Sequence, residues 1–206
     1  MKYCFIILTT LTIVACNEHK KRLPYYNTAD FTPKWDISKE KPFHQIRPFR
    51  LINQANLAFT EKEMDGKICV ADFFFTTCPG ICPKMTQNMA DIQKEFLNDD
   101  EVLLLSHSVN PNNDSVSVLK QYAKDQKVDI KRWKLLTGEK NEIYDLGRRY
   151  YFVEEDEGFV KKDDVFLHTE NFILLDKERH IRGIYNGLDP NSIRNLIADI
   201  KMLKDE

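Results

Sequence analysis

The sequence lacks an excess of positive charge, a membrane-spanning apolar run and any internal repeat. Its 30 lysines and arginines are outnumbered by 32 aspartates and glutamates, so no basic field is available to bind nucleic acid. The apolar run near the amino terminus is too short to cross a bilayer. We therefore expect neither a nucleic-acid-binding protein nor a repeat array.

Residues 1–15 have the pattern of a bacterial lipoprotein signal. Lys2 provides the positive end, an apolar run follows, and Ile13-Val-Ala-Cys16 matches the processing site. We expect cleavage before Cys16 and acylation of that cysteine. The lipid would anchor the protein to a membrane of the cell envelope, facing the periplasm. An ordinary secretory signal cut nearby, or a short membrane anchor, is the alternative.

Residues 16–42 are polar and charged, with three prolines and no sustained hydrophobic period, which predicts a tether. The tether is unusually aromatic, so part of it is expected to lie along the domain. Residues 43–206 remain, and they are numerous enough to form one domain with a buried core.

The stretch that carries most of the chemical information contains Cys78-Pro-Gly-Ile-Cys82-Pro. An apolar, β-branched and aromatic run over 68–75 precedes it and predicts a strand buried on both faces. Pro79-Gly80 suits a type II turn, which would fold Cys82 back toward Cys78. Pro83 suits the start of a helix, whose positive end lowers the pKa of a nearby thiol. We expect two convergent, activated thiols in a soft-metal site, a redox site, or both.

A structural disulfide, or two buried thiols, is the alternative interpretation of Cys78 and Cys82. A bridge across a three-residue loop constrains the unfolded chain little, so it would contribute only modest stability. The thiols are also expected at the carboxyl end of a central strand, where open α/β folds bind ligands. Cys69 lies early in the same strand and is expected to be a small core residue.

Strands and helices alternate over residues 43–206. Strands are expected at 48–53 (an edge strand), 68–75, 102–109, 135–136, 171–175 and 180–185, with helices at 83–96, 143–150 and 190–203. A further helix is expected after Asp114, which can cap it. The last two strands are expected to form an antiparallel pair. This order fits an α/β thioredoxin-like fold with insertions, a central mixed sheet flanked by helices.

His168 is the candidate for a third ligand. It follows a charged loop and precedes a predicted strand, a junction where side chains converge on sites. Two thiolates and one imidazole form a soft ligand set suited to Cu(I). Of the other histidines, His19, His44 and His180 are expected to face solvent, and His107 to be buried and hydrogen-bonded. Met85 could offer a thioether but is expected in the core.

Three motifs resemble the Sco/SenC family of copper-binding thioredoxin-fold proteins. They are Phe75-Thr-Thr-Cys78-Pro-Gly-Ile-Cys82-Pro, then Ser106-His-Ser-Val-Asn-Pro111 with Asp114 and Tyr122, and His168-Thr-Glu-Asn-Phe-Ile-Leu-Leu-Asp176. Two departures are Leu167, where the family commonly has Asp, and Val-Asn-Pro in place of Val-Asp-Pro.

The resemblance implies copper ligation by Cys78, Cys82 and His168, as Cu(I) with Cu(II) as a second candidate state. It also implies a partner, the copper-site subunit of a terminal oxidase. The family delivers copper to the dinuclear copper site of respiratory cytochrome oxidase, or reduces the cysteines of that site.

Asp72 lies six residues before Cys78, the spacing at which thioredoxins carry a buried acid. A desolvated carboxylate there has a raised pKa and can relay a proton to or from a thiol. The alternative is an acid paired with a surface lysine.

Three functions are compatible with these residues. His168 favours a copper metallochaperone, because a plain dithiol exchanger does not require a histidine. Asp72 favours a thiol-disulfide oxidoreductase that reduces cysteines of a partner in the cell envelope. A thiol peroxidase is weaker, because no peroxide-activating arginine or threonine can be assigned beside a thiol.

Overall fold

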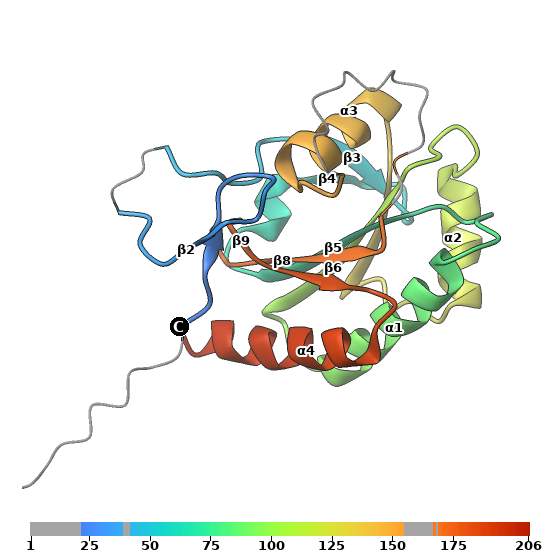
Figure 1. Cartoon of the computed structure of the whole chain (residues 1–206). Helices are drawn as coiled ribbons and strands as arrows, with labels where there is room; N and C mark the ends of the chain where they lie inside the picture. Colours follow the sequence, from blue (N-terminus) through green and yellow to red (C-terminus); the bar gives the residue numbers. More distant parts are fainter. Residues whose placement is uncertain (1–21, 39–41, 155–166, 168) are drawn as a thin grey trace, which may run out of the picture.

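Residues 22–38, 42–154, 167 and 169–206 are described by a computed structural model, in which a mixed sheet runs through the centre (Figure 1). The sheet has nine strands in the order β2-β1-β9-β8-β5-β6-β7-β3-β4. Their bounds are β1 Tyr25–Tyr26, β2 Pro33–Lys34, β3 Arg50–Asn53, β4 Ala58–Thr60, β5 Ile68–Phe74, β6 Val102–Ser108, β7 Trp133–Thr137, β8 Asn171–Leu175 and β9 Ile181–Asn186. Strands β5, β6 and β7 are parallel, and the remaining pairings are antiparallel.

Helices cover both faces of this sheet. They are α1 Cys82–Glu95, α2 Val116–Asp125, α3 Lys140–Asp145 and α4 Pro190–Lys204, with a 3₁₀ turn η1 Glu61–Met64 and a π-helical turn η2 Leu146–Tyr150. Apolar residues of α1, α2 and α4 pack in one cluster, and those of α3 and η2 pack in a second cluster on the opposite face. The predicted α/β class with a mixed sheet flanked by helices is confirmed.

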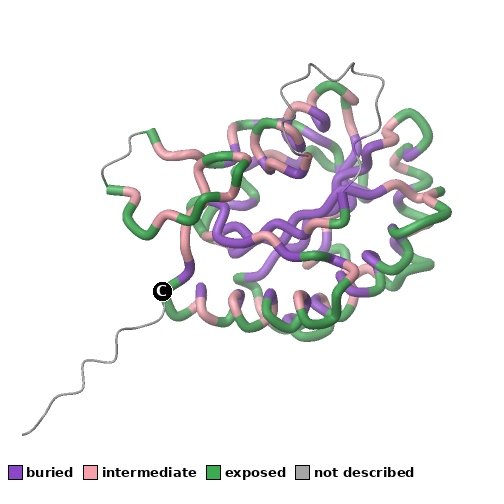
Figure 2. Tube along the Cα trace, viewed as in Figure 1, coloured by how far each residue is buried: buried purple, intermediate pink, exposed green. Residues whose placement is uncertain are grey.

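Strand β5 is buried along its whole length and divides the two clusters (Figure 2). Its side chains alternate between the faces, as the two-residue period of a strand requires. Val70 and Phe74 belong to the cluster under α1, whereas Ala71 and Phe73 belong to the cluster under α3. The largely apolar run therefore predicts this strand correctly, because a strand covered on both sides needs mostly apolar residues, and Asp72 is its one charged residue.

Two local predictions are wrong. The strand predicted at the sheet edge is β3, which pairs with both β4 and β7, so the shorter β4 forms the edge. Asp114 does not cap α2. Its neighbour Ser115 is the cap and accepts a hydrogen bond from the backbone N–H of Val118 at 3.4 Å.

Part of the predicted tether pairs with the domain. In β1, Tyr26 pairs with Ile181 of β9, so the aromatic residues lie along the sheet as expected. This strand covers His180, which is 7% exposed rather than solvated, and the Tyr25 ring lies 5.8 Å from its imidazole. The boundary of the domain at residue 43 remains a prediction.

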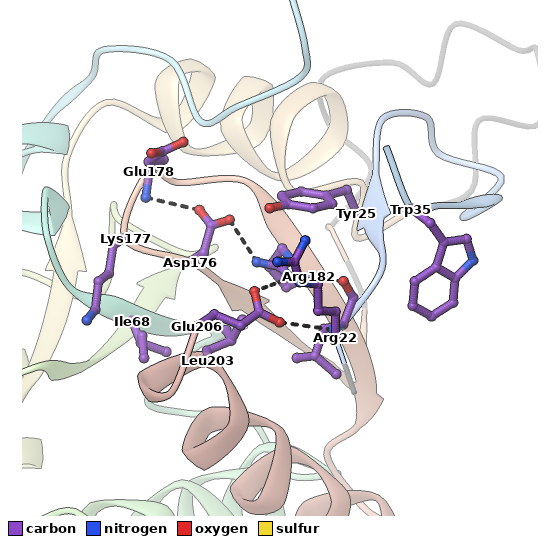
Figure 3. Close-up of a pocket in the computed structure, with 11 residues that line it drawn as sticks. Arg22, Tyr25, Trp35, Ile68, Asp176, Lys177, Glu178, Arg182, Leu203 and Glu206 are labelled. Atoms are coloured by element: carbon purple, nitrogen blue, oxygen red, sulfur yellow. Dashed lines mark hydrogen bonds and ion pairs between the residues drawn. The ribbon is translucent and has the colours of Figure 1, made fainter. Parts of the chain in front are cut away.

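A buried arginine holds the amino-terminal segment to the carboxyl terminus (Figure 3). Arg182 is 3% exposed and donates hydrogen bonds to the carbonyl oxygens of Leu23 and Pro24. It also forms ion pairs with Asp176 at 3.3 Å and Glu206 at 2.7 Å. A cavity of about 580 Å³ lies here, lined in part by Ile68 at the start of β5, Tyr25 and Trp35.

None of the described helices has the length and apolar character needed to span a membrane.

Candidate metal centre

The two cysteines lie where β5 passes into α1. The chain turns at Thr76-Thr77, and the backbone N–H of Cys78 donates to the carbonyl of Phe75 at 3.2 Å. Helix α1 then starts at Cys82, with Pro83 in its first turn, as predicted. The predicted type II turn at Pro79-Gly80 is wrong, because Gly80 does not have the positive φ that such a turn requires.

Cys78 and Cys82 are nevertheless in contact, and both are free thiols. Partial burial raises the pKa of Cys78, but hydrogen bonds from the Cys82 thiol and from the backbone N–H groups of Cys82, Gly80 and Ile81 outweigh this effect. The net result is a lowered pKa for Cys78. The N–H groups at the start of α1 thus point at the sulfur of the first cysteine.

The pKa of Cys82 is shifted in the opposite direction. Cys82 is 5% exposed and packs in the cluster under α1, so burial raises its pKa, and its hydrogen bond to Cys78 raises it further. The expectation of two activated thiols is therefore wrong for Cys82. Its sulfur faces the core, whereas Cys78 is partly exposed and receives the hydrogen bonds.

Asp72 is buried beneath the cysteines. It is 1% exposed, and burial raises its pKa to about 7. One carboxylate oxygen, Oδ1, has no hydrogen-bond partner among the described residues. Its negative charge contributes to the raised pKa of Cys82. The alternative of an acid paired with a surface lysine is wrong, since a carboxyl this buried is far from the solvated surface.

A second buried acid anchors the loop, and the sequence analysis missed its role. Asp114 is 0% exposed. Its carboxylate accepts hydrogen bonds from the backbone N–H of Thr76 at 3.1 Å, from the Thr76 hydroxyl at 2.5 Å and from the Ser108 hydroxyl at 2.5 Å. The signal available in the sequence was a polar residue at the carboxyl end of each of two adjacent parallel strands, Thr76 after β5 and Ser108 in β6.

His168 lies outside the described residues, and so do Cys16 and His19, whose expected exposure to solvent stays a prediction. The neighbours of residue 168 are both buried: Leu167 is 2% exposed and Thr169 is 7% exposed. The backbone N–H of Leu167 donates to the Tyr144 hydroxyl, which donates in turn to the carbonyl of Val109 at 3.0 Å. Within the described residues, no group of three or more His, Cys, Asp or Glu side chains could hold a metal.

The burial of Leu167 accounts for one departure from the family pattern, a leucine where the family commonly has aspartate. A Cβ atom added to Gly147 would lie 2.6 Å from Cδ1 of Leu167 and 3.1 Å from Cε1 of Phe73. Leu167 therefore packs closely against η2 and β5 in the core. An aspartate here would place a carboxylate among apolar side chains, at a considerable cost in free energy.

The other candidate residues have structural roles. Cys69 and Met85 are 0% exposed core residues, as predicted. His107 is fully buried, stacks on Phe73 with ring centroids 4.9 Å apart, and has Nδ1 3.4 Å from the Asp72 carbonyl. Burial lowers its pKa to about 4. His44 is half-buried with Nε2 2.8 Å from the Tyr150 carbonyl, so its predicted exposure is wrong.

Known proteins share this architecture. The SCO1/SenC family model matches residues 38–205. The crystal structure of a SCO1/SenC family lipoprotein from Bacillus anthracis str. Ames is 30% identical, with a TM-score of 0.69 over 78% of this chain and 95% of that one. BsSco, described as a cytochrome c oxidase assembly protein with a disulfide switch, is 29% identical, with a TM-score of 0.67 over 82% of this chain and 99% of that one.

Bradyrhizobium japonicum ScoI, solved with copper bound, is 25% identical to this chain. Its TM-score is 0.60 over 75% of this chain and 96% of that one. These likenesses confirm the predicted thioredoxin-like fold. Because the family model covers most of the sequence, the chain belongs to the SCO1/SenC family.

Proposed function

We propose that this protein binds copper through Cys78, Cys82 and His168 and delivers it during assembly of the dinuclear copper site of a cytochrome c oxidase. The observation that carries the proposal is the contact between Cys78 and Cys82, with N–H groups of the helix start directed at Cys78. Two adjacent sulfur ligands suit Cu(I), which prefers thiolates. Copper is the cargo, and a relative of this chain holds it.

His168 completes the proposed site as a third donor. The proposal is supported by the hydrogen-bond chain from Leu167 through Tyr144 to Val109, because the N–H of Val109 donates to the carbonyl of Phe74 at 2.8 Å. The backbone beside residue 168 is thereby connected to the end of β5, from which the cysteine loop departs. A histidine positioned by this series of hydrogen bonds would lie near the end of β5, from which the cysteine loop departs.

A competition titration against a Cu(I) chelator tests the site. His168→Ala should lower the Cu(I) affinity by more than the roughly 10–100-fold that is typical of losing an outer contact to a metal site. The disulfide equilibrium of Cys78 and Cys82 should change little. His19→Ala is the control, because it removes a histidine that is not one of the three proposed ligands. An affinity unchanged in His168→Ala would remove His168 from the ligand set.

A second candidate function is reduction of a partner's disulfide. It is favoured by the asymmetry between partly exposed Cys78, with its lowered pKa, and buried Cys82, with its raised pKa. The Cys78 thiolate would attack the partner disulfide and release one partner thiolate, which takes up a proton. Cys82 would give its proton to the Asp72 carboxylate and attack the Cys78 sulfur. The second partner thiolate leaves, two electrons have moved to the partner, and a Cys78–Cys82 disulfide remains.

Single-cysteine variants distinguish the attacking thiol. Cys82→Ser should accumulate a mixed disulfide between Cys78 and a model disulfide, whereas Cys78→Ser should accumulate almost none. Equal trapping by both variants would contradict this assignment. Metal content after purification under reducing conditions then separates copper delivery from thiol exchange.

We also infer that the mature protein begins at an acylated Cys16 and faces the periplasm from a membrane. A related structure is that of a lipoprotein. Mass spectrometry of the amino-terminal peptide should find a lipid on Cys16. A retained Met1 or an unmodified Cys16 would contradict the inference.

A further inference from the structure

Asp114 holds the cysteine loop in a way that its sequence position does not suggest. It is completely buried, yet within the described residues no lysine or arginine forms an ion pair with it. A buried carboxylate without a cation is costly unless hydrogen bonds satisfy it. Among the described residues, the Asp114 carboxylate accepts its three hydrogen bonds from Thr76 and Ser108, so these donors compensate for its burial.

Core packing restrains only part of the loop between β5 and α1. Thr77, Pro79, Gly80 and Ile81 are exposed, so core packing does not restrain them. Cys82 belongs to α1, whereas Cys78 lies four residues before it and is only partly buried against the cluster under α1. Thr76 is two residues before Cys78, and both its backbone N–H and its hydroxyl bind Asp114.

On its other side, Asp114 is hydrogen-bonded to the end of strand β6 in the sheet. Ser108 ends β6, where it pairs with Phe74 at the end of β5. The chain then folds back, and the backbone N–H of Asp114 donates to the carbonyl of Asn110 at 2.9 Å. Asp114 therefore connects the segment that leads to Cys78 to the centre of the sheet through β6.

We propose that Asp114 is a positioning residue that sets the separation of the Cys78 and Cys82 sulfurs through Thr76. This proposal rests on the proposed function for its copper arm only. Chelation of Cu(I) and formation of the Cys78–Cys82 disulfide both require the two sulfurs to be close. A loop that is already held there loses less conformational entropy in either event.

The test compares Thr76→Val with Thr76→Ser. Valine keeps the size and backbone N–H of threonine but removes the hydroxyl that donates to Asp114, whereas serine retains it. Hydrogen bonds to charged groups contribute enough that Thr76→Val should lower both the Cu(I) affinity and the disulfide equilibrium constant against glutathione by about tenfold. Thr76→Ser should restore both to near the wild-type value.

Asp114→Ala should produce the same two changes, and the double variant Thr76→Val/Asp114→Ala should be no worse than Asp114→Ala alone. Non-additivity of this kind shows that two residues act through one interaction. Ser115→Ala is the matched control. It removes the hydroxyl that caps α2 in the same segment, and it should lower stability slightly while leaving both equilibria unchanged.

Two outcomes would overturn the proposal. One is a loss of stability in Thr76→Val with both equilibria at the wild-type value, which would make Asp114 structural only. The other is a fall in both equilibria in Ser115→Ala as large as in Thr76→Val. If Asp114→Ala does not fold, the Thr76 pair decides the question. If wild-type protein binds no Cu(I), the proposed function fails, and the disulfide equilibrium still tests Asp114.

Discussion

Two buried charged groups near opposite ends of strand β5, Arg182 and Asp72, differ in how far neighbouring groups compensate their charge. At Ile68, where the strand begins, Arg182 is surrounded by carbonyl oxygens and two carboxylates, and its guanidinium lies 3.9 Å from the Tyr25 ring centroid. At the other end, Asp72 is buried with one oxygen unpartnered among the described residues. The charge of Arg182 is compensated by several partners, whereas Asp72 keeps one carboxylate oxygen without a partner, which leaves a group ready to exchange a proton.

The cavity in Figure 3 illustrates the same difference. Asp176 and Glu206, on its lining, are engaged with Arg182, and Glu206 also accepts a hydrogen bond from the backbone N–H of Leu23 at 3.1 Å. These polar groups hold the amino-terminal segment in place. At the thiol end, Cys78 is only partly buried and packs against the cluster under α1.

The largest expected effect is at the compensated end. Arg182→Met removes the cation and leaves Asp176 and Glu206, both largely buried, without their arginine partner, which should lower the free energy of unfolding by about 3–5 kcal/mol. The measurement is urea unfolding at pH 7. Arg149→Ala is the control, because Arg149 has a 79% exposed side chain and a surface ion pair with Asp145. It should cost under about 1 kcal/mol. Similar losses in the two variants would contradict the comparison.

Asp72→Asn should have the opposite sign. The pKa of Asp72 is raised from 3.8 to about 7, so the native state retains its proton where the unfolded state has lost it. Wild-type stability therefore falls as the pH rises from about 4 to 7, by up to about 1.4 kcal/mol per unit. The asparagine variant lacks this fall and should become more stable than wild type by about 2–4 kcal/mol above pH 7.

The same variant tests the proton relay. Asp72→Asn should slow thiol-disulfide exchange more than it weakens copper binding, because the amide cannot accept the proton of Cys82. Exchange rates measured from pH 6 to 9, together with urea unfolding at each pH, check both effects. Unchanged rates would make Asp72 a structural residue, and a parallel pH dependence of stability in variant and wild type would contradict its raised pKa.

Elements whose formation depends on neighbouring residues in the sequence were predicted correctly. The apolar run of β5 and the Asp189-Pro190 start of α4 are found as predicted. The errors involve distant partners. Asp114 was assigned as a cap, but it binds Thr76, 38 residues earlier in the chain. Arg182 binds the Leu23 carbonyl 159 residues away. No periodicity or short motif contains such pairings.

The histidines and the Pro-Gly pair show the same limit. Strand alternation suggested an exposed His180, but Tyr25 and Phe43 each lie with their rings 5.8 Å from it. The Pro79-Gly80 pair suits a type II turn in isolation, yet α1 begins immediately afterwards at Cys82. The start of the helix fixes the geometry of the loop and overrides the weak preference of the dipeptide.

A smaller effect is expected from Gly147→Ala. The added methyl would lie 2.6 Å from Leu167 and should displace it, which costs about 1–3 kcal/mol of stability. Because Leu167 precedes the proposed ligand His168, Cu(I) affinity should fall while the disulfide equilibrium is unchanged. Gly138→Ala is the matched control, since its added methyl would lie 2.8 Å from Cδ2 of Leu51, away from Leu167. Equal Cu(I) affinities in the two variants would separate Leu167 from copper binding.

The smallest effect is expected at Tyr151, behind Phe73 in the cluster under α3. Its hydroxyl is buried and has no hydrogen-bond partner among the described residues, and the ring lies 5.1 Å from that of His107. Removing an unsatisfied buried hydroxyl relieves its desolvation cost, so Tyr151→Phe should leave the free energy of unfolding unchanged or raise it by about 1 kcal/mol.

Tyr185→Phe provides the contrast, because the Tyr185 hydroxyl donates to Asp199 at 2.7 Å. Its loss should lower the free energy of unfolding by about 1–2 kcal/mol, since a hydrogen bond to a charged group is removed. Urea unfolding of the two variants at pH 7 measures the difference. A comparable loss in Tyr151→Phe would mean that its hydroxyl is satisfied in solution, by a bound water or by His107, and that the cluster under α3 contains a polar contact of its own.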